Sequence, residues 1–165
     1  MALGLGGGLA GGILPRVGGS LTAGVGLLLP RVRADLEGLW LTRRRASLVD
    51  QGAGGDLRVG AVRPLVCRRF GGPIWTAPIC GGLELGVLVG HGFGVTAPRT
   101  QRHLWLGGLA SAGGSWSARP WLAVRLRAEL VVSPLRREFT VLDRSLFTTR
   151  PVGGRLHLGI EFRLP

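Results

Sequence analysis

Charged and apolar side chains alternate at every second position along much of this chain. The pattern is clearest over residues 31–41, 121–132 and 155–164, where aliphatic residues fill most of the alternate positions. A period of two residues is typical of a β-strand with two different faces, because successive side chains point to opposite sides of the sheet. On the charged face of these segments lie Arg33, Asp35, Glu37, Arg125, Arg127, Glu129, Arg155, His157, Glu161 and Arg163.

Weaker forms of the same pattern occur elsewhere in the chain. They cover residues 3–8, 20–29, 56–66, 79–90 and 103–112. In the third of these segments, Arg58 falls on the face opposite Leu57, Val59 and Ala61. Together with the three clear segments this gives eight, so we expect an all-β chain that forms a single domain over residues 1–165. The expected fold is a closed, antiparallel, up-and-down β-barrel of about eight strands.

Helices do not explain this pattern. An amphipathic helix repeats its apolar residues at positions i, i+3, i+4 and i+7 and tolerates few internal glycines. Here the charges recur at every second residue, and glycine accounts for 30 of the 165 residues. A transmembrane helix needs about 18 consecutive apolar residues, and the uncharged runs of this chain are shorter and interrupted by Gly or Pro. We therefore do not expect an α-helical membrane protein.

The connections between the expected strands alternate in length. Short links at residues 15–18, around Pro30 and at 113–120 alternate with longer ones at 43–55, 91–102 and 133–154. Outer-membrane barrels likewise combine short periplasmic turns with longer external loops.

The stretch from Cys67 to Cys80 departs from this alternation, because a short turn is expected there and the cysteines are thirteen positions apart. A disulfide would shorten the stretch, and we expect one between these cysteines in an oxidising compartment. The alternative is a pair of unpaired small hydrophobic residues. A metal site is not expected, since the chain has no CxxC motif and no clustered histidines.

Alternation alone does not say which face of the barrel is inside. A soluble barrel hides its apolar face, whereas a barrel in a membrane turns that face toward lipid. We assign Gly38, Gly60, Gly86 and Gly159 to the charged face, and small residues suit the narrow interior of eight strands. Large aliphatic residues on the other face suit contact with acyl chains. We therefore favour a transmembrane barrel, with a soluble, lipocalin-like ligand-binding barrel as the alternative.

If the charged face is internal, positive and negative side chains share a narrow lumen. Buried charges persist only when they are paired and hydrogen-bonded, and such pairs plug a small barrel rather than leave a large open pore. The expected lumen network consists of Arg33, Asp35, Glu37, Arg58, Glu84, Arg125, Arg127, Glu129, His157, Glu161 and Arg163.

The residues expected outside the lumen favour membrane contacts over nucleic-acid binding. The formal net charge is +12, but the arginines are scattered from Arg16 to Arg163 without a long basic tract, so no nucleic acid partner is expected. We expect the excess positive charge in loops and at rims, facing anionic headgroups. Trp40, Trp105 and Trp121 are candidate aromatic anchors at the membrane interfaces, with ordinary packing as the alternative.

Three stretches resemble the outer membrane protein A-like eight-stranded barrels. They are Cys67 with residues 80–86, residues 121–137 and the closing residues 150–165. The chain looks similar to small barrels of high-GC Gram-negative bacteria, and it contains no Lys, Asn or Tyr. The resemblance implies location in the bacterial outer membrane, contact with its lipids including lipopolysaccharide, and insertion by the barrel assembly machinery; we expect a monomer.

Export would require a secretion signal, and no basic residue precedes the apolar stretch of residues 1–14. The printed chain therefore either begins downstream of such a signal or is the mature portion with a start Met.

Three functions remain open. A structural, anchoring or loop-presenting barrel is the leading hypothesis, and a narrow pore or solute channel is the first alternative. A lipid-modifying enzyme could use His91 or His103 with a serine among Ser111, Ser115 and Ser117. However, the chain has no GxSxG motif and no carboxylate evidently placed to orient a histidine, so we expect no enzyme, cofactor or metal.

Overall fold

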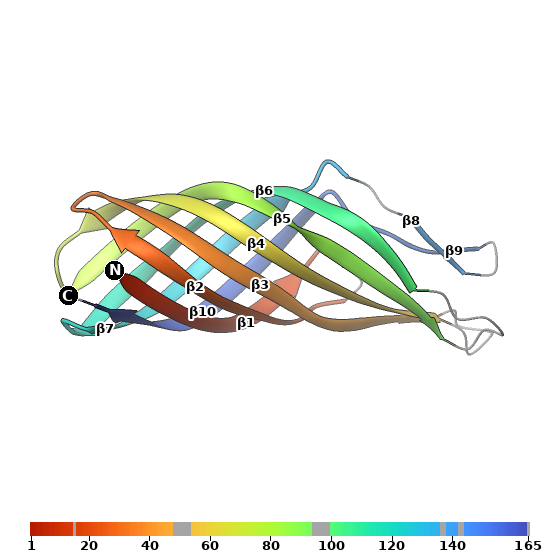
Figure 1. The fold of residues 1–165 in the computed structure, drawn as a ribbon, viewed down its shortest axis with the longest axis horizontal. Coiled ribbons are helices and arrows are strands. Elements are labelled where there is room, and N and C mark those ends of the chain that lie inside the picture. Colours follow the sequence, from red (N-terminus) through yellow and green to blue (C-terminus); the bar gives the residue numbers. More distant parts are fainter. Residues whose placement is uncertain (15, 48–53, 94–99, 136–137, 142–143, 165) are drawn as a thin grey trace.

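The computed structural model is a closed barrel of eight antiparallel strands (Figure 1). It describes residues 1–14, 16–47, 54–93, 100–135, 138–141 and 144–164. The barrel strands are β1 (Ala2–Gly11), β2 (Gly18–Leu28), β3 (Val32–Ser47), β4 (Gly54–Gly71), β5 (Trp75–Phe93), β6 (Thr100–Arg119), β7 (Leu122–Val132) and β10 (Val152–Arg163). A hairpin of β8 (Glu138–Val141) and β9 (Arg144–Thr148) lies between β7 and β10. Within these residues there is no helix of the length and apolarity needed to cross a bilayer.

Pairing of the first and last barrel strands closes the sheet. β1 pairs with β10 from Ala2 opposite Arg163 to Gly11 opposite Gly154. The other pairs of the barrel join strands that are consecutive in the chain, except that β7 pairs with β10 because the β8–β9 hairpin lies outside the barrel sheet. The expected fold class is confirmed, and each of the eight expected segments falls on one strand. Both termini lie at one end of the barrel, which we call the terminal end; the opposite end is the loop end (Figure 1).

The turns at the terminal end are all short. They span residues 29–31, 72–74 and 120–121. A long connection between Cys67 and Cys80 was expected, and this is wrong, because β4 and β5 remain paired beyond both cysteines as far as Gly71. Gly71 has a φ of +103°, and a Cβ there would lie 2.5 Å from the carbonyl oxygen of Trp75, so the tight turn requires glycine.

The expected disulfide between Cys67 and Cys80 is present. The two residues lie directly opposite each other in the β4–β5 register, and both are buried. The bridge therefore crosslinks two strands inside the barrel instead of closing an external loop.

Aliphatic side chains form a band around the outside of the barrel. On β5 and β10 the outward residues are 42–59% exposed: Leu83, Leu85, Val87, Leu156, Leu158 and Ile160. On β4 the outward positions between Arg58 and Arg68 are Gly60, Val62, Pro64 and Val66. These two arginines are ten residues apart, which at ~3.3 Å per residue and a tilt of ~40° corresponds to ~25 Å, the height of the apolar band of outer-membrane barrels.

The interior is divided into two halves. Toward the loop end most of the side chains are apolar, and they include Leu57, Val59, Leu88 and Trp105, with Ile13 and Leu14 of the connection between β1 and β2. The guanidinium group of Arg44 is also buried there and donates to backbone carbonyl oxygens of Ala10 and Arg16. Toward the terminal end the interior is filled by arginines and carboxylates. An apolar inner half was not expected from the alternation pattern, which suggested charge along the whole inner face.

Small residues line the inner face of β1 and β2. They are Ala2, Gly4, Gly6, Gly8 and Ala10 on β1, and Ser20, Thr22, Gly24 and Gly26 on β2. A Cβ on Gly26 would lie 2.1 Å from Asp35 Oδ1, and one on Gly24 would lie 2.7 Å from Glu37 Cγ. The long side chains of β3 occupy the interior space beside β1 and β2, and this is why the inner faces of these two strands carry small residues.

We predict that Gly26→Ala destabilises the barrel by about 1–3 kcal/mol, because the new methyl group forces Asp35 away from Arg33. The matched control is Gly7→Ala, whose Cβ would point outward with no heavy atom closer than 3.7 Å, and it should change stability by less than about 0.5 kcal/mol. Urea unfolding in lipid vesicles, followed by tryptophan fluorescence, measures both. Equal stabilities of the two variants would contradict the packing described here.

Candidate functional site

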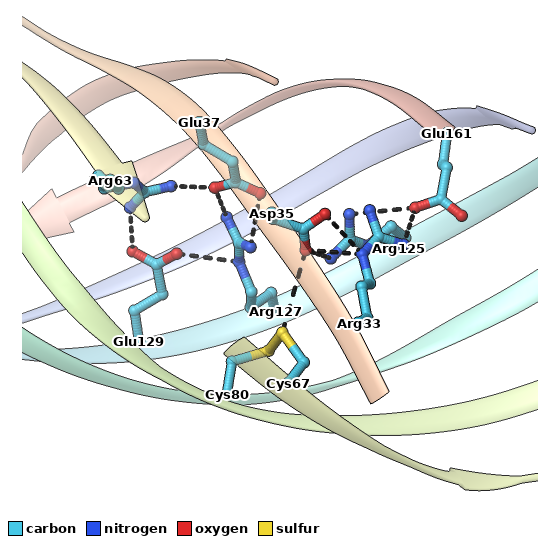
Figure 2. Close-up of a disulfide and its surroundings, with 10 residues drawn as sticks. All are labelled: Arg33, Asp35, Glu37, Arg63, Cys67, Cys80, Arg125, Arg127, Glu129 and Glu161. Carbon is cyan, nitrogen blue, oxygen red and sulfur yellow. Dashed lines mark hydrogen bonds and ion pairs between the residues drawn. A yellow bond between two sulfur atoms is a disulfide. The ribbon is translucent and has the colours of Figure 1, made fainter. Parts of the chain in front are cut away.

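A network of charged side chains fills the terminal half of the barrel interior (Figure 2). It draws inward-facing residues from five strands, namely β3, β4, β5, β7 and β10. Its arginines are Arg33, Arg63, Arg125, Arg127, Arg155 and Arg163. Its carboxylates are Asp35, Glu37, Glu84, Glu129 and Glu161.

The centre of the network is built on Arg63 and Arg127. Arg63 donates to Glu37 at 2.6 Å and to Glu129 at 2.8 Å, and its side chain is fully buried. Arg127 donates to both oxygens of Glu37, at 2.9 and 2.7 Å, and lies 2.9 Å from Glu129. Each of the two carboxylates is therefore shared by two guanidinium groups, and charge-assisted, bidentate pairs of this kind are among the strongest side-chain contacts.

A second group of ion pairs surrounds Glu161 nearer the terminal end. Glu161 accepts from Arg125 at 3.2 Å and from Arg163 at 2.9 Å, and it also contacts Arg33. Arg33 in turn donates to Asp35 at 2.6 Å. Asp35 lies beside the disulfide, with one carboxylate oxygen 3.9 Å from the sulfur of Cys67 (Figure 2).

Glu84 connects the network to the apolar half of the interior. It accepts from Arg155 Nη2 at 2.8 Å and from the indole N–H of Trp105. The network also includes His157, whose Nε2 lies 3.4 Å from the Glu129 carboxylate. Because Trp105 belongs to the apolar cluster and also binds a carboxylate, it joins the two halves into one packed interior.

The structure places ten of the eleven expected lumen residues inside the barrel, and Arg58 is the exception. Arg58 is exposed on the outer face, with its guanidinium 5.9 Å from the ring centroid of Trp40. The β4 face that we expected to point outward, with Leu57, Val59 and Ala61, is the inner one. The assignment was wrong because the loop-end half of the interior is apolar, so charge does not mark the inner face there.

Sequence reasoning missed Arg63, the most buried arginine of the network. Arg63 lies between Val62 and Pro64, and it shares a strand face with Leu57 and Cys67. The signal that could have found it is Cys67: strand positions two residues apart face the same side, and a cysteine in a cross-strand disulfide inside the barrel puts Arg63 inside as well. Gly38 and Gly60, which we assigned to the charged face from sequence, both face outward, because they alternate with the inward-facing residues of their strands.

Of the three tryptophans expected at the membrane interfaces, Trp105 does not lie there. It is 1% exposed and sits inside the barrel, because residues 103, 105 and 107 form the inner face of β6. Trp40 and Trp121 do face outward. Two others were missed: Trp75 and Trp116 stack on each other near the terminal end, with ring centroids 6.0 Å apart.

Comparisons with known proteins identify the fold. No family model matches the sequence, and a search of curated proteins found no match. Neisserial surface protein A has a structure similar to this chain, with a TM-score of 0.72 and 11% identity, covering 99% of this chain and 95% of that protein. Ail, the attachment invasion locus protein of Yersinia pestis, in complex with the heparin analogue sucrose octasulfate, is similar with a TM-score of 0.60 and 11% identity, covering 99% and 96%. The chain thus has the fold of small outer-membrane barrels.

We predict that Glu37→Gln destabilises the barrel by about 3–5 kcal/mol, because Arg63 and Arg127 lose the carboxylate between them while remaining buried. The matched control is Asp56→Asn. Asp56 also contacts two arginines, at 3.3 and 3.5 Å, but those arginine side chains are about two-thirds exposed, so the loss should be at most about 1 kcal/mol. Urea unfolding of the refolded protein compares the two, and a loss for Glu37→Gln as small as that for Asp56→Asn would refute the structural role of the network.

Proposed function

We propose that this chain is an outer-membrane barrel with a structural, anchoring or loop-presenting role. The observation that carries the proposal is that, among the described residues, packed apolar side chains occupy one half of the interior and ion-paired side chains the other, inside a wall whose outer surface is aliphatic. Such a molecule is suited to fixing its loop end at a membrane surface rather than to transmitting solutes through its centre.

The distribution of side chains supports insertion in a membrane. Leucine, valine and isoleucine side chains cover the outer wall over a height of ~25 Å, whereas a soluble protein rarely exposes an apolar patch of more than a few hundred Å². The backbone groups of the barrel wall pair between strands around the closed circle, as a lipid environment requires. A soluble, lipocalin-like barrel would instead place this aliphatic surface in water.

The outer membrane is the compartment in which closed antiparallel barrels with an aliphatic outer band are found. The two similar structures are described as Neisserial surface protein A and the attachment invasion locus protein of Yersinia pestis, and their fold supports the same assignment for this chain. We further propose that the aliphatic band contacts outer-membrane lipids including lipopolysaccharide, that the barrel assembly machinery inserts the chain, and that the chain is a monomer.

The loop end provides the surface for a presenting role. β3, β4, β5 and β6 have 16, 18, 19 and 20 residues, whereas β1, β2, β7 and β10 have 10–12. The long strands continue past the rest of the barrel at the loop end, and the β8–β9 hairpin projects at the same end (Figure 1). A rigid β-platform of this kind can hold the connecting segments above a membrane.

The two alternative functions have less support. A narrow pore needs a continuous water path, and both halves of the interior are occupied by packed side chains. A lipid-modifying enzyme needs a histidine beside its nucleophile and orienting group, but His103 pairs in register with the inward-facing Leu88, while His91 is exposed on the outer face. The ring of His91 contacts the hydroxyl of Thr100 at 2.9 Å. Asp56 lies opposite His91 in the β4–β5 register, but its carboxylate contacts Arg43 and Arg45.

We predict that the refolded protein shows no regular conductance steps in planar lipid bilayers, because apolar side chains and ion-paired side chains occupy the two halves of the interior that the structure describes. Heat-modifiable migration on gels serves as the control for folding, since only a folded barrel resists the detergent until it is heated. Reproducible single-channel steps from protein that passes this control would replace the sealed scaffold with a narrow channel.

We also predict no deacylation of lipid A by the refolded protein. Its His91→Ala and His103→Ala variants should be indistinguishable from the unmodified chain by mass spectrometry of the lipid. Turnover that either substitution abolishes would establish the enzyme instead.

A further inference from the structure

We propose that the outer wall around β3 binds one lipid A molecule of lipopolysaccharide, with an acyl chain in a groove and a phosphate held by Arg43, Arg45 and Arg58. The proposal rests on the outer-membrane location proposed above and adds a specific ligand and its site. It is argued from a groove, a cluster of arginines, and the side chain that connects them.

The groove lies on the outer face where β1, β2, β3 and β10 meet. It has a volume of about 700 Å³, within the ~300–1,000 Å³ range of ligand pockets, and its lining is almost entirely apolar. Gly7, Ala23 and Gly38 form its outward-facing floor, because they have little or no side chain. Larger side chains stand around them, namely Leu5, Leu21, Trp40, Val124, Leu158 and Ile160.

A β-bulge turns two arginines outward directly above this groove. The β3–β4 register shifts between Leu41 and Arg44, so that Thr42 and Arg43 lie opposite the single residue Arg58. Before the bulge the odd-numbered residues of β3 face inward, and after it Arg44 is buried while Arg43 and Arg45 are exposed. Without the bulge these two arginines would point into the apolar half of the interior; bulges commonly re-aim side chains in this way.

The cluster carries more positive than negative charge. Arg43 and Arg45 lie 3.5 and 3.3 Å from Asp56, and their side chains remain 66% and 67% exposed. Arg58 lies over the ring of Trp40, and no carboxylate of the described residues pairs with it. One carboxylate thus pairs with two of the three guanidinium groups, which leaves N–H donors free for an anion such as phosphate.

The groove and the cluster are continuous along one strand. Gly38, Trp40 and Arg43 follow one another on the outer face of β3 toward the loop end, and Trp40 both borders the groove and lies beneath Arg58. Arg58 also marks the loop-end edge of the aliphatic band. An acyl chain in the groove therefore places its headgroup phosphate level with the arginines, in the outer leaflet, where the phosphate-bearing lipid is lipopolysaccharide.

Native mass spectrometry of the refolded protein in a zwitterionic detergent tests this site with three probes: bis-phosphorylated lipid A, the same glycolipid without phosphates, and phosphatidylethanolamine. We expect one bis-phosphorylated lipid A per chain. The triple variant Arg43→Gln, Arg45→Gln, Arg58→Gln should bind it about 100-fold more weakly, at roughly a fivefold loss for each arginine, and the corresponding Arg→Lys variant should lose less than about tenfold.

The groove is tested by Gly38→Leu, which fills it and should weaken binding about tenfold or more. A Cβ on Gly38 would meet only the Ala23 carbonyl oxygen, at 3.7 Å, so the variant should fold. Gly108→Leu is the matched control, because Gly108 lies on β6, away from the groove, and has no heavy atom within 4 Å of the added Cβ. Arg68→Gln, at the terminal edge of the band and over Phe70 at 5.6 Å, is the control for the arginines.

Three outcomes would overturn the proposal. They are equal binding of the dephosphorylated glycolipid, equal binding by the Gly38→Leu and Gly108→Leu variants, and a dimer that Gly38→Leu dissociates, which would make the groove an interface between two copies of this chain. Heat-modifiable migration in the same preparations shows whether the barrel is folded. A folded barrel that does not bind lipid A would refute the lipid site but leave the proposed function intact.

Discussion

Charge inside a narrow barrel is tolerated when each group finds an opposite charge or hydrogen-bond acceptors, since an isolated buried ion costs several kcal/mol. In this chain Glu37, Glu129 and Glu161 each contact two or more arginines, so the five carboxylates balance all but one of the six arginines of the network within the wall. The rest of the structure accommodates that network. Glycines on the inner face of β1 and β2 leave room for it, the disulfide crosslinks the strands beside it, and the aliphatic residues between the charged positions are left to form the outer surface.

The strands that carry the charged network were predictable from the sequence, because the network places charges on one face of each strand. On β3, β7 and β10 a charge occupies nearly every second position, so a period of two is visible without knowledge of neighbouring strands. Inner-face positions such as Arg33, Glu129 and Glu161 follow directly from that period. The pairing of Cys67 with Cys80 was also predictable, although its place inside the barrel was not, because strand length depends on pairing partners that a single sequence does not display.

The remaining features depend on contacts between strands. Arg58 was assigned inward and Arg63 overlooked, because the inner face of β4 changes from apolar to charged along its length as it passes from the Trp105 cluster to the network. For Trp105 the sequence leaves both an interface anchor and ordinary packing open, since nothing in its local sequence reveals that its N–H reaches Glu84 across the interior. The bulge at Leu41 that turns Arg43 outward likewise arises from the β3–β4 register and leaves no mark in the alternation.

The central claim is that aliphatic side chains of the wall contact lipid while the residues between them are sealed inside. The most direct measurement is a nitroxide scan of residues 155–162 on β10 in lipid vesicles, recording accessibility to oxygen and to a water-soluble nickel complex. The account predicts oxygen accessibility with a period of two, highest at Leu156, Leu158 and Ile160, and low accessibility to both reagents at Arg155, His157 and Glu161. High accessibility of the three aliphatic positions to the nickel complex would place them in water and contradict the account.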